Sequence, residues 1–146
     1  MLIMRILRND EIKEAYGKFL DKMEWSYFFT LTTVYGLTEK SARRLVERWF
    51  NKFKITGSRL FWGSEKYESK DGCHMHGLLF MPVNEQKLLF KETGINKFQR
   101  DINKMWHEVS GGNNRAQILR FDNKKDGGGY CTKYINKNSC DYDLIF

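Results

Sequence analysis

The sequence contains few of the features that mark linkers, disulfide scaffolds or membrane spans. It has one proline, Pro82, and three cysteines, and no apolar run approaches the roughly 18 residues of a membrane helix. An odd set of cysteines without framework spacing does not indicate a disulfide scaffold. The apolar start is broken by charges after a few residues, unlike a signal peptide. These absences predict a cytoplasmic protein with no membrane partner.

Positive charge exceeds negative charge. Lys and Arg number 25 against 18 Asp and Glu, which gives a net charge of +7 and a pI of about 9.3. Hydrophobic residues make up 41% of the 146 residues, enough for the core of one folded domain. A basic domain of this size either binds a polyanion, first of all nucleic acid, or uses its lysines for solubility.

Periodicity and turn residues predict an α+β fold, with a central antiparallel β-sheet and flanking helices. Thr38 is expected to cap the second helix and Gly57 to end it. The turn at 70–72 joins two strands into a hairpin. The expected helices cover 10–24, 38–56, 84–93 (short), 95–109 and 130–138, and the expected strands cover 27–34, 59–69, 73–82 and 115–122.

Two histidines lie two residues apart in the strand CHMHGLLF. Strand geometry places His74 and His76 on one face, where both can bind one metal ion. Glu65, on the preceding strand of the hairpin, is the expected third ligand, and Glu68 is the fallback. The alternatives are a buried, hydrogen-bonded histidine pair and a zinc site with Cys73. The zinc site fits poorly because Cys73 faces the other side.

A second group lies in GGGYCTKYINKN. On a helix, Tyr130 and Tyr134 share a face, with Lys133 close to it and Lys137 one turn further on. A phenol beside a lysine and a metal can act as a nucleophile, because both positive charges stabilise developing negative charge. The alternative is a solvated surface helix with two core tyrosines.

Together these motifs resemble the HUH endonucleases, specifically the rolling-circle replication initiators (Rep proteins) of small phages, plasmids and single-stranded DNA viruses. The similar segments are FFTLTT at 28–33, HMHGLLF at 74–80 and YCTKY at 130–134. The resemblance spans most of the chain and implies a single HUH endonuclease domain over 1–146 with the Rep nuclease fold.

The resemblance assigns roles to the residues that match. It implies that His74, His76 and Glu65 bind Mg²⁺ or Mn²⁺ and that Tyr130 is the nucleophile, with Lys133 assisting at the phosphate. Tyr134 stands where two-tyrosine relatives carry their second nucleophile. Three further residues are expected to contact DNA: Thr30, Thr32 and Lys137.

The implied activity is metal-dependent, site-specific nicking of single-stranded DNA and strand transfer through a covalent 5′-phosphotyrosine, which initiates rolling-circle replication. The implied partners are single-stranded or hairpin origin DNA and host replication proteins, for a monomer or weak dimer. The cell is bacterial or archaeal, or the location is nuclear for a eukaryotic virus.

Three other interpretations stay open. The chain resembles single-tyrosine HUH transposases in size, although Tyr-x-x-Lys-Tyr favours a Rep protein. A catalytically inactive origin DNA-binding module would keep the phosphate contacts without cleavage, and an RNA-binding domain would leave the histidine pair unexplained. Without a GxxxxGK[ST] motif, the chain is either a compact nuclease or the nuclease part of a longer Rep protein.

Overall fold

The three-dimensional structure is a computed structural model, and it describes residues 9–82, 94–112, 114–121 and 139–146. The helices and strands in these ranges alternate without an internal repeat. In chain order they are α1 (Asn9–Asp21), β1 (Tyr27–Leu31), α2 (Glu39–Phe53), β2 (Arg59–Lys66), β3 (Cys73–Phe80), α4 (Gly94–Ser110), β4 (Ala116–Arg120) and β5 (Ser139–Ile145). The α+β class predicted from the sequence is confirmed.

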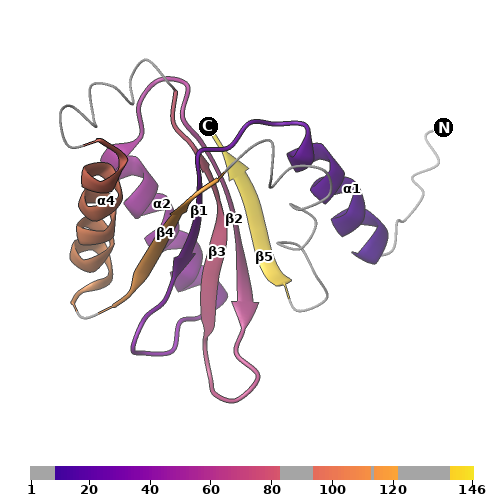
Figure 1. Cartoon of the computed structure of the whole chain (residues 1–146). Coiled ribbons are helices and arrows are strands. Elements are labelled where there is room, and N and C mark those ends of the chain that lie inside the picture. The colour runs from indigo at the N-terminus through magenta and orange to yellow at the C-terminus, as the bar shows by residue number, and fades with distance from the viewer. Residues whose placement is uncertain (1–8, 83–93, 113, 122–138) are drawn as a thin grey trace.

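The strands form one antiparallel sheet in the order β4-β1-β3-β2-β5. Helices α2 and α4 pack on one face of this sheet, and α1 packs on the other face beside β5 (Figure 1). Among the described helices, none has the length and hydropathy required to cross a bilayer. The sheet therefore has one face fully covered by two helices and one face covered only in part.

Aromatic side chains fill the larger core, between the sheet and the helices α2 and α4. Trp49 of α2 donates its indole N–H to the carbonyl of Ile102 at 2.8 Å. Its ring lies 5.2 Å from that of Phe29 on β1 and 6.3 Å from that of Trp106 on α4. Large buried aromatics contribute most of the apolar area in such a core. They fix the helix-covered face of the sheet.

Helix α2 follows from its sequence. Thr38 caps it as predicted, because its hydroxyl accepts a hydrogen bond from the N–H of Ser41 at 3.1 Å. The helix ends at Phe53, however, so the predicted end at Gly57 is wrong. The hydroxyl of Ser58 accepts from the N–H of Ile55 at 3.0 Å and closes a separate turn before β2. Gly57 takes up a positive φ of 91° within that turn.

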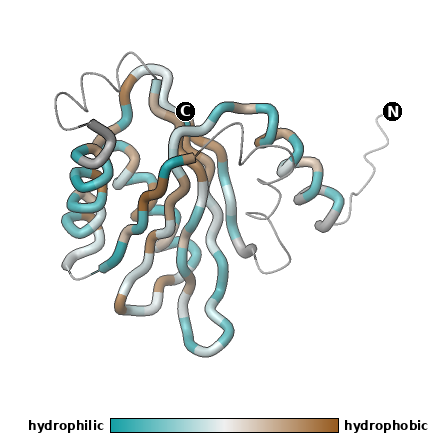
Figure 2. The backbone as a smooth tube through the Cα atoms, viewed as in Figure 1, coloured by the Kyte–Doolittle hydropathy of each residue, from teal (hydrophilic) through white to brown (hydrophobic). Residues whose placement is uncertain are grey.

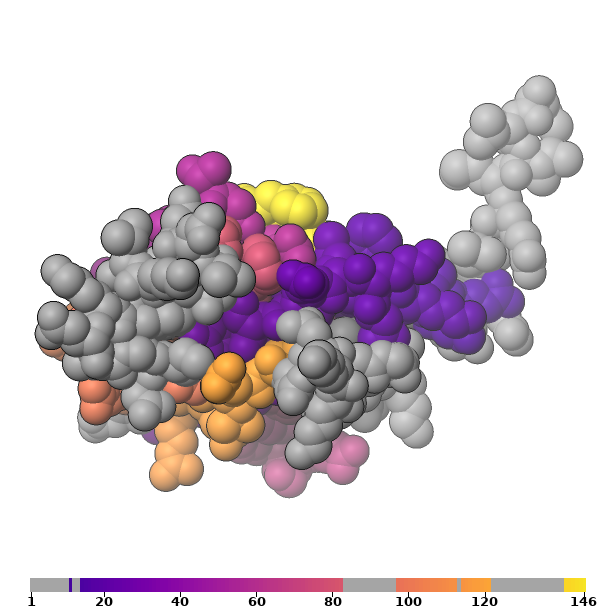
Figure 3. All heavy atoms as spheres, turned by 45° about the horizontal axis from the view of Figure 1, so that its top comes forward, coloured from indigo at the N-terminus to yellow at the C-terminus, as the bar shows by residue number. Residues whose placement is uncertain are grey.

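A smaller core lies under α1 on the opposite face. Tyr16 contacts Phe61 of β2 at 5.6 Å and Tyr142 of β5 at 5.3 Å, measured between ring centroids. Leu20 and Leu78 are fully buried in the same cluster. Figure 3 shows α1 (indigo) next to the end of β5 (yellow). Helix α1 thus covers one end of this face.

The predicted hairpin of β2 and β3 is confirmed, and its register sets Glu65 opposite His74. Gly72 takes a φ of 101° in the connecting turn, a conformation that favours glycine. Gly77 is required for a different reason. A Cβ there would overlap the carbonyl oxygen of Phe61 and approach the ring of Phe29 to 2.9 Å. Figure 2 shows hydrophilic residues at the tip of this hairpin.

Strand β5 was not predicted. It forms because Arg43 of α2 binds both of its aspartates. The guanidinium donates to the two carboxylate oxygens of Asp141 at 3.0 and 2.8 Å and to Asp143 at 2.8 Å, and it lies 5.0 Å from the ring of Trp62. These hydrogen bonds raise the pKa of Arg43 above its usual value. A segment that is polar in sequence thereby becomes a strand of the sheet.

Two side-chain amides of α4 contact β4, at the edge of the sheet. Gln99 donates to the carbonyl of Ile118 at 2.8 Å, and Asn103 donates to the carbonyl of Ala116 at 2.7 Å. The carbonyl of Arg115 points toward β1, where it accepts from the N–H of Thr32, so the carbonyl of the next residue points outward. The amides therefore satisfy outward-facing acceptors of the edge strand.

Other boundaries differ from prediction by a few residues. Strand β1 ends at Leu31 rather than at 34, β2 ends at Lys66 rather than at 69, and α1 ends at Asp21 rather than at 24. The short helix predicted over 84–93 and the helix predicted over 130–138 lie outside the described residues.

Candidate metal centre

The sheet face opposite α2 and α4 changes from apolar to polar along its strands. On β3, buried Leu78 is followed by His76 and His74 toward the hairpin turn, and on β2, buried Phe61 is followed by Glu65. Alternate residues of a strand share a face, so these five residues lie on the same side of the sheet. Helix α1 covers the apolar end, and the polar end holds the histidines.

Glu65, His74 and His76 form a compact group. One ligand atom from each residue lies within 4.8 Å of the other two. The Nε2 of His76 is 3.3 Å from Oε2 of Glu65, and the Nε2 of His74 is 3.8 Å from the same oxygen. Two imidazoles and one carboxylate converging from one side match a three-ligand metal site that leaves coordination positions open.

The surroundings keep the site ready to bind a cation. Burial lowers the pKa of His74, and the neighbouring Glu65 opposes this shift only in part. A neutral imidazole has a free lone pair, and the neutral form is the one that binds metals. The side chain of His76 is 11% exposed and that of Glu65 is 22% exposed, so the group lies in a recess of the surface. The donor set fits a divalent metal ion.

Tyr67 extends this centre beyond the residues that sequence reasoning had found. Its ring lies 5.2 Å from that of His74, and the rings of His74 and His76 are 5.5 Å apart. The ammonium of Lys70 lies 4.3 Å from the centre of the Tyr67 ring. The signal was available in the sequence, because Tyr67 follows Glu65 by two residues and so continues its face of the strand.

The predicted DNA contacts of β1 lie beside this centre. Thr30 is the sheet partner of His76 on one side and of Gln117 on the other. Thr32 follows the end of β1, and its hydroxyl donates to the carbonyl of Arg115 at 3.3 Å. Glu68, the fallback ligand, is not part of the group formed by the described residues.

The predicted nucleophile segment lies outside the described residues, which applies to Tyr130, Lys133, Tyr134 and Lys137. The described chain resumes at Ser139, the first residue of β5. The Cα partner of Ser139 in the sheet is Glu65. Strand β5 therefore begins beside the carboxylate of the candidate metal centre.

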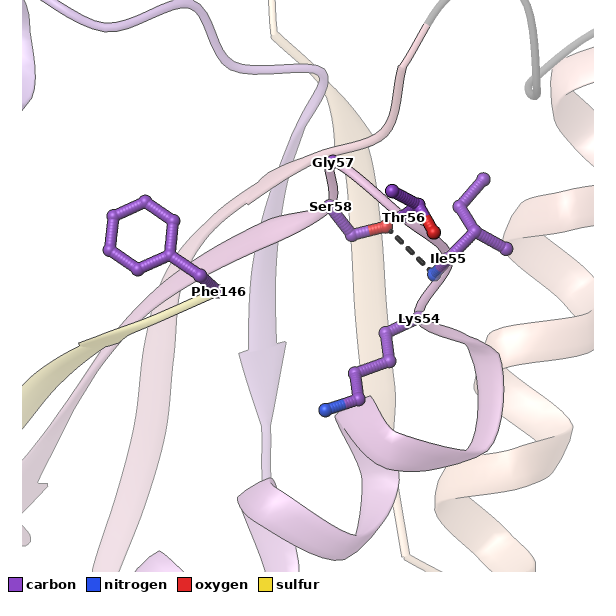
Figure 4. A pocket seen from close by; sticks show the side chains of 6 residues that line it. All are labelled: Lys54, Ile55, Thr56, Gly57, Ser58 and Phe146. Atoms are coloured by element: carbon purple, nitrogen blue, oxygen red, sulfur yellow. Dashed lines mark hydrogen bonds between the residues drawn. The ribbon is translucent and has the colours of Figure 1, made fainter.

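A separate cavity of about 660 Å³ lies at the other end of the sheet. Figure 4 shows its lining, which comes from the turn before β2 and from the residue after β5. Its residues are Lys54, Ile55, Thr56, Gly57, Ser58 and Phe146. Strand β2 runs from this turn to Glu65, so the length of the strand separates the cavity from the histidines.

The comparisons with known proteins agree with the position of this centre. A family model for the replication-associated protein ORF2 matches residues 26–139, well over half of the 146-residue chain. The matched range contains Glu65, both histidines and Tyr130. Neither the curated proteins nor the solved structures include a match. The family is associated with replication, which points to replication initiation and to interaction with DNA. This chain belongs to the replication-associated protein ORF2 family.

Proposed function

We propose that the chain is a single HUH endonuclease domain over 1–146, a metal-dependent nickase and strand transferase that initiates rolling-circle replication on single-stranded or hairpin origin DNA. The observation that carries the proposal is the group of Glu65, His74 and His76 on the partly covered sheet face. Membership of a replication-associated family supplies the biological context.

In this proposal Glu65, His74 and His76 hold one Mg²⁺ or Mn²⁺ ion. Carboxylate oxygen suits both ions, and imidazole favours Mn²⁺ of the two. When bound, the ion polarises a non-bridging oxygen of the scissile phosphate and holds the phosphate in line for attack. The three side chains approach from the sheet and leave the opposite side of the site for the DNA.

Tyr130 is the proposed nucleophile. Its phenolic oxygen forms a bond to phosphorus as the bond from phosphorus to the 3′ oxygen breaks. The phenol loses its proton, and the released 3′ oxygen gains one. Lys133 balances charge on the phosphate, and Tyr134 is a candidate for a second transfer. Support comes from Ser139, which lies opposite Glu65 and follows Tyr130 by nine residues, a span of about 14 Å if helical.

Residues beside the centre are proposed to guide the strand. Thr30, Thr32 and Lys137 offer hydroxyl and ammonium donors to phosphates, and Thr30 is adjacent to His76 in the sheet. Exposed aromatics such as Tyr35, which is 44% exposed, can stack unpaired bases.

A denaturing gel tests the proposal. The purified chain is incubated with single-stranded oligonucleotides that include the origin of its own replicon, with Mn²⁺ or with EDTA. The variants are Tyr130→Phe, Tyr134→Phe and His76→Ala. Tyr142→Phe is the matched control, because it removes a phenol from the same sheet face outside the proposed chemistry. We expect a metal-dependent covalent adduct with wild type and Tyr142→Phe, and none with Tyr130→Phe or His76→Ala.

The remaining outcomes separate the alternatives. Loss of the adduct only in Tyr134→Phe would exchange the roles of the two tyrosines, and partial loss in both would indicate two nucleophiles. If the protein binds its own origin without forming an adduct, it is an origin-binding module and not a nickase.

A further inference from the structure

Helix α2 carries four cations at every fourth position. They are Lys40, Arg44, Arg48 and Lys52, and all four are exposed. Residues four apart lie on one face of a helix, so these side chains form a continuous row, here called the basic row. Lys52 pairs with Glu108 of α4 at 3.4 Å. Within the described ranges, the other three take part in no ion pair.

The adjacent row of the same helix is arranged differently. Arg43 pairs with Glu47 at 3.6 Å and binds Asp141 and Asp143 of β5. The carboxylates near this part of α2 are thus engaged by Arg43. They leave the basic row uncompensated.

The basic row has a cost to the folded protein. Like charges four residues apart on a helix destabilise it, and this row contains three such pairs in succession. Solubility does not require this order, because cations at scattered positions would give the same net charge. A row that opposes helix formation is better explained by a negatively charged ligand that spans it.

The position of the row excludes the candidate metal centre as its purpose. Helix α2 packs on the sheet face opposite His74 and His76 (Figure 1). The row rises about 6 Å per member and about 18 Å from Lys40 to Lys52. This length equals about five nucleotide steps of B-DNA at 3.4 Å each.

We infer that the basic row of α2 binds the phosphate backbone of double-stranded DNA, separately from the single strand at the metal centre. The choice of DNA as the polyanion rests on the proposed function. An initiator that holds the duplex beside its nicking site remains near that site while only one strand enters the centre. The contact is to phosphates, so it carries no sequence preference of its own.

Salt-dependent binding tests this inference. The affinity of the full chain for a 20-base-pair duplex without the origin sequence is measured by fluorescence anisotropy in EDTA, at several NaCl concentrations. The row variant is Lys40→Gln/Arg44→Gln/Arg48→Gln. The control is Lys18→Gln/Lys22→Gln/Lys97→Gln, which removes the same charge from exposed positions on α1, after α1 and on α4. Lys18 and Lys97 are already paired with Glu14 and Asp101.

We expect the row variant to bind about tenfold or more weakly at 50 mM salt, with a slope of log K against log salt smaller by about 2.7, since each lost phosphate contact removes about 0.9. The control should keep the wild-type slope. The row variant should also melt at a higher temperature, because the repulsion is gone. Adduct formation on a short, saturating single strand should be unchanged in both variants.

Three results would overturn the inference: no duplex binding by wild type, equal losses in row variant and control, or an unchanged slope in the row variant. Binding of wild type to vesicles of anionic lipid but not to duplex would assign the row to a membrane surface instead. Failure of adduct formation in wild type would contradict the proposed nickase without affecting the duplex measurement, so the two failures are distinguishable.

Discussion

Two rings contact the imidazole of His74, that of Tyr67 at 5.2 Å and that of His76 at 5.5 Å. A metal-binding histidine usually donates its second ring N–H to a carboxylate or carbonyl, which fixes its orientation. The Nδ1 of His74 has no such hydrogen-bond partner among the described residues. Ring packing against Tyr67, with Lys70 over the far ring, is therefore the contact that orients this ligand.

Removing the Tyr67 ring should weaken metal binding. We expect Tyr67→Ala to lower Mn²⁺ affinity about tenfold or more, within the range of lost outer contacts to a metal ligand. Tyr67→Phe keeps the ring and should match wild type. Calorimetric titration with Mn²⁺ measures both. Equal affinities in the Ala and Phe variants would show that the ring does not orient His74, and a loss in Phe alone would assign the role to the hydroxyl.

At the scale of the elements, β5 depends on a helix almost a hundred residues earlier. The side chain of Arg43 is 34% exposed and makes three hydrogen bonds to two aspartates of the strand. A planar guanidinium can bind both oxygens of one carboxylate and still reach a second carboxylate, which an ammonium cannot do. The contact joins α2 to the strand that starts beside Glu65.

Arg43→Leu should destabilise the fold by about 1–2 kcal/mol, which is the value of charged hydrogen bonds reduced for partial exposure. Arg43→Lys should recover only part of this loss. Urea unfolding measures the free energy of unfolding. Arg44→Leu is the control, because Arg44 is exposed and makes no ion pair within the described ranges. A loss in Arg44→Leu as large as that in Arg43→Leu would contradict a specific role for the contact to β5.

Local sequence predicted the elements whose determinants are local. The hairpin followed from turn residues and alternation, and with it the approach of Glu65 to His74. Strand β5 could not be predicted, because Asp141 and Asp143 disfavour strands until Arg43 binds them. The end of α2 was wrong because the hydroxyl of Ser58, beyond the glycine, decides where the turn forms. Tyr67 was missed because its role is ring packing, and a search for metal ligands passes over a phenol.

For the molecule as a whole, the candidate metal centre links two strands in the middle of the sheet. Its ligands are nine and eleven residues apart in the chain, measured from Glu65. The unfolded chain does not hold them together, so a metal that binds only the folded form must stabilise it.

Mn²⁺ at 100 times its dissociation constant should therefore raise the free energy of unfolding by about 2.7 kcal/mol. Thermal unfolding with and without Mn²⁺ measures the effect. Glu65→Gln should abolish most of the shift, because it removes the charged ligand. Glu68→Gln is the matched control and should retain the shift. Similar shifts in both variants would place the metal elsewhere.

The hydrogen bonds from Gln99 and Asn103 to β4 have a further consequence for crowded conditions. A strand at the edge of a sheet is a template on which another chain can continue the ladder. Here α4 occupies the carbonyls of Ile118 and Ala116 with its own amides. Copies that accumulate together therefore meet no vacant acceptors at these two positions. The helix that builds the core also protects this margin against sheet-to-sheet aggregation.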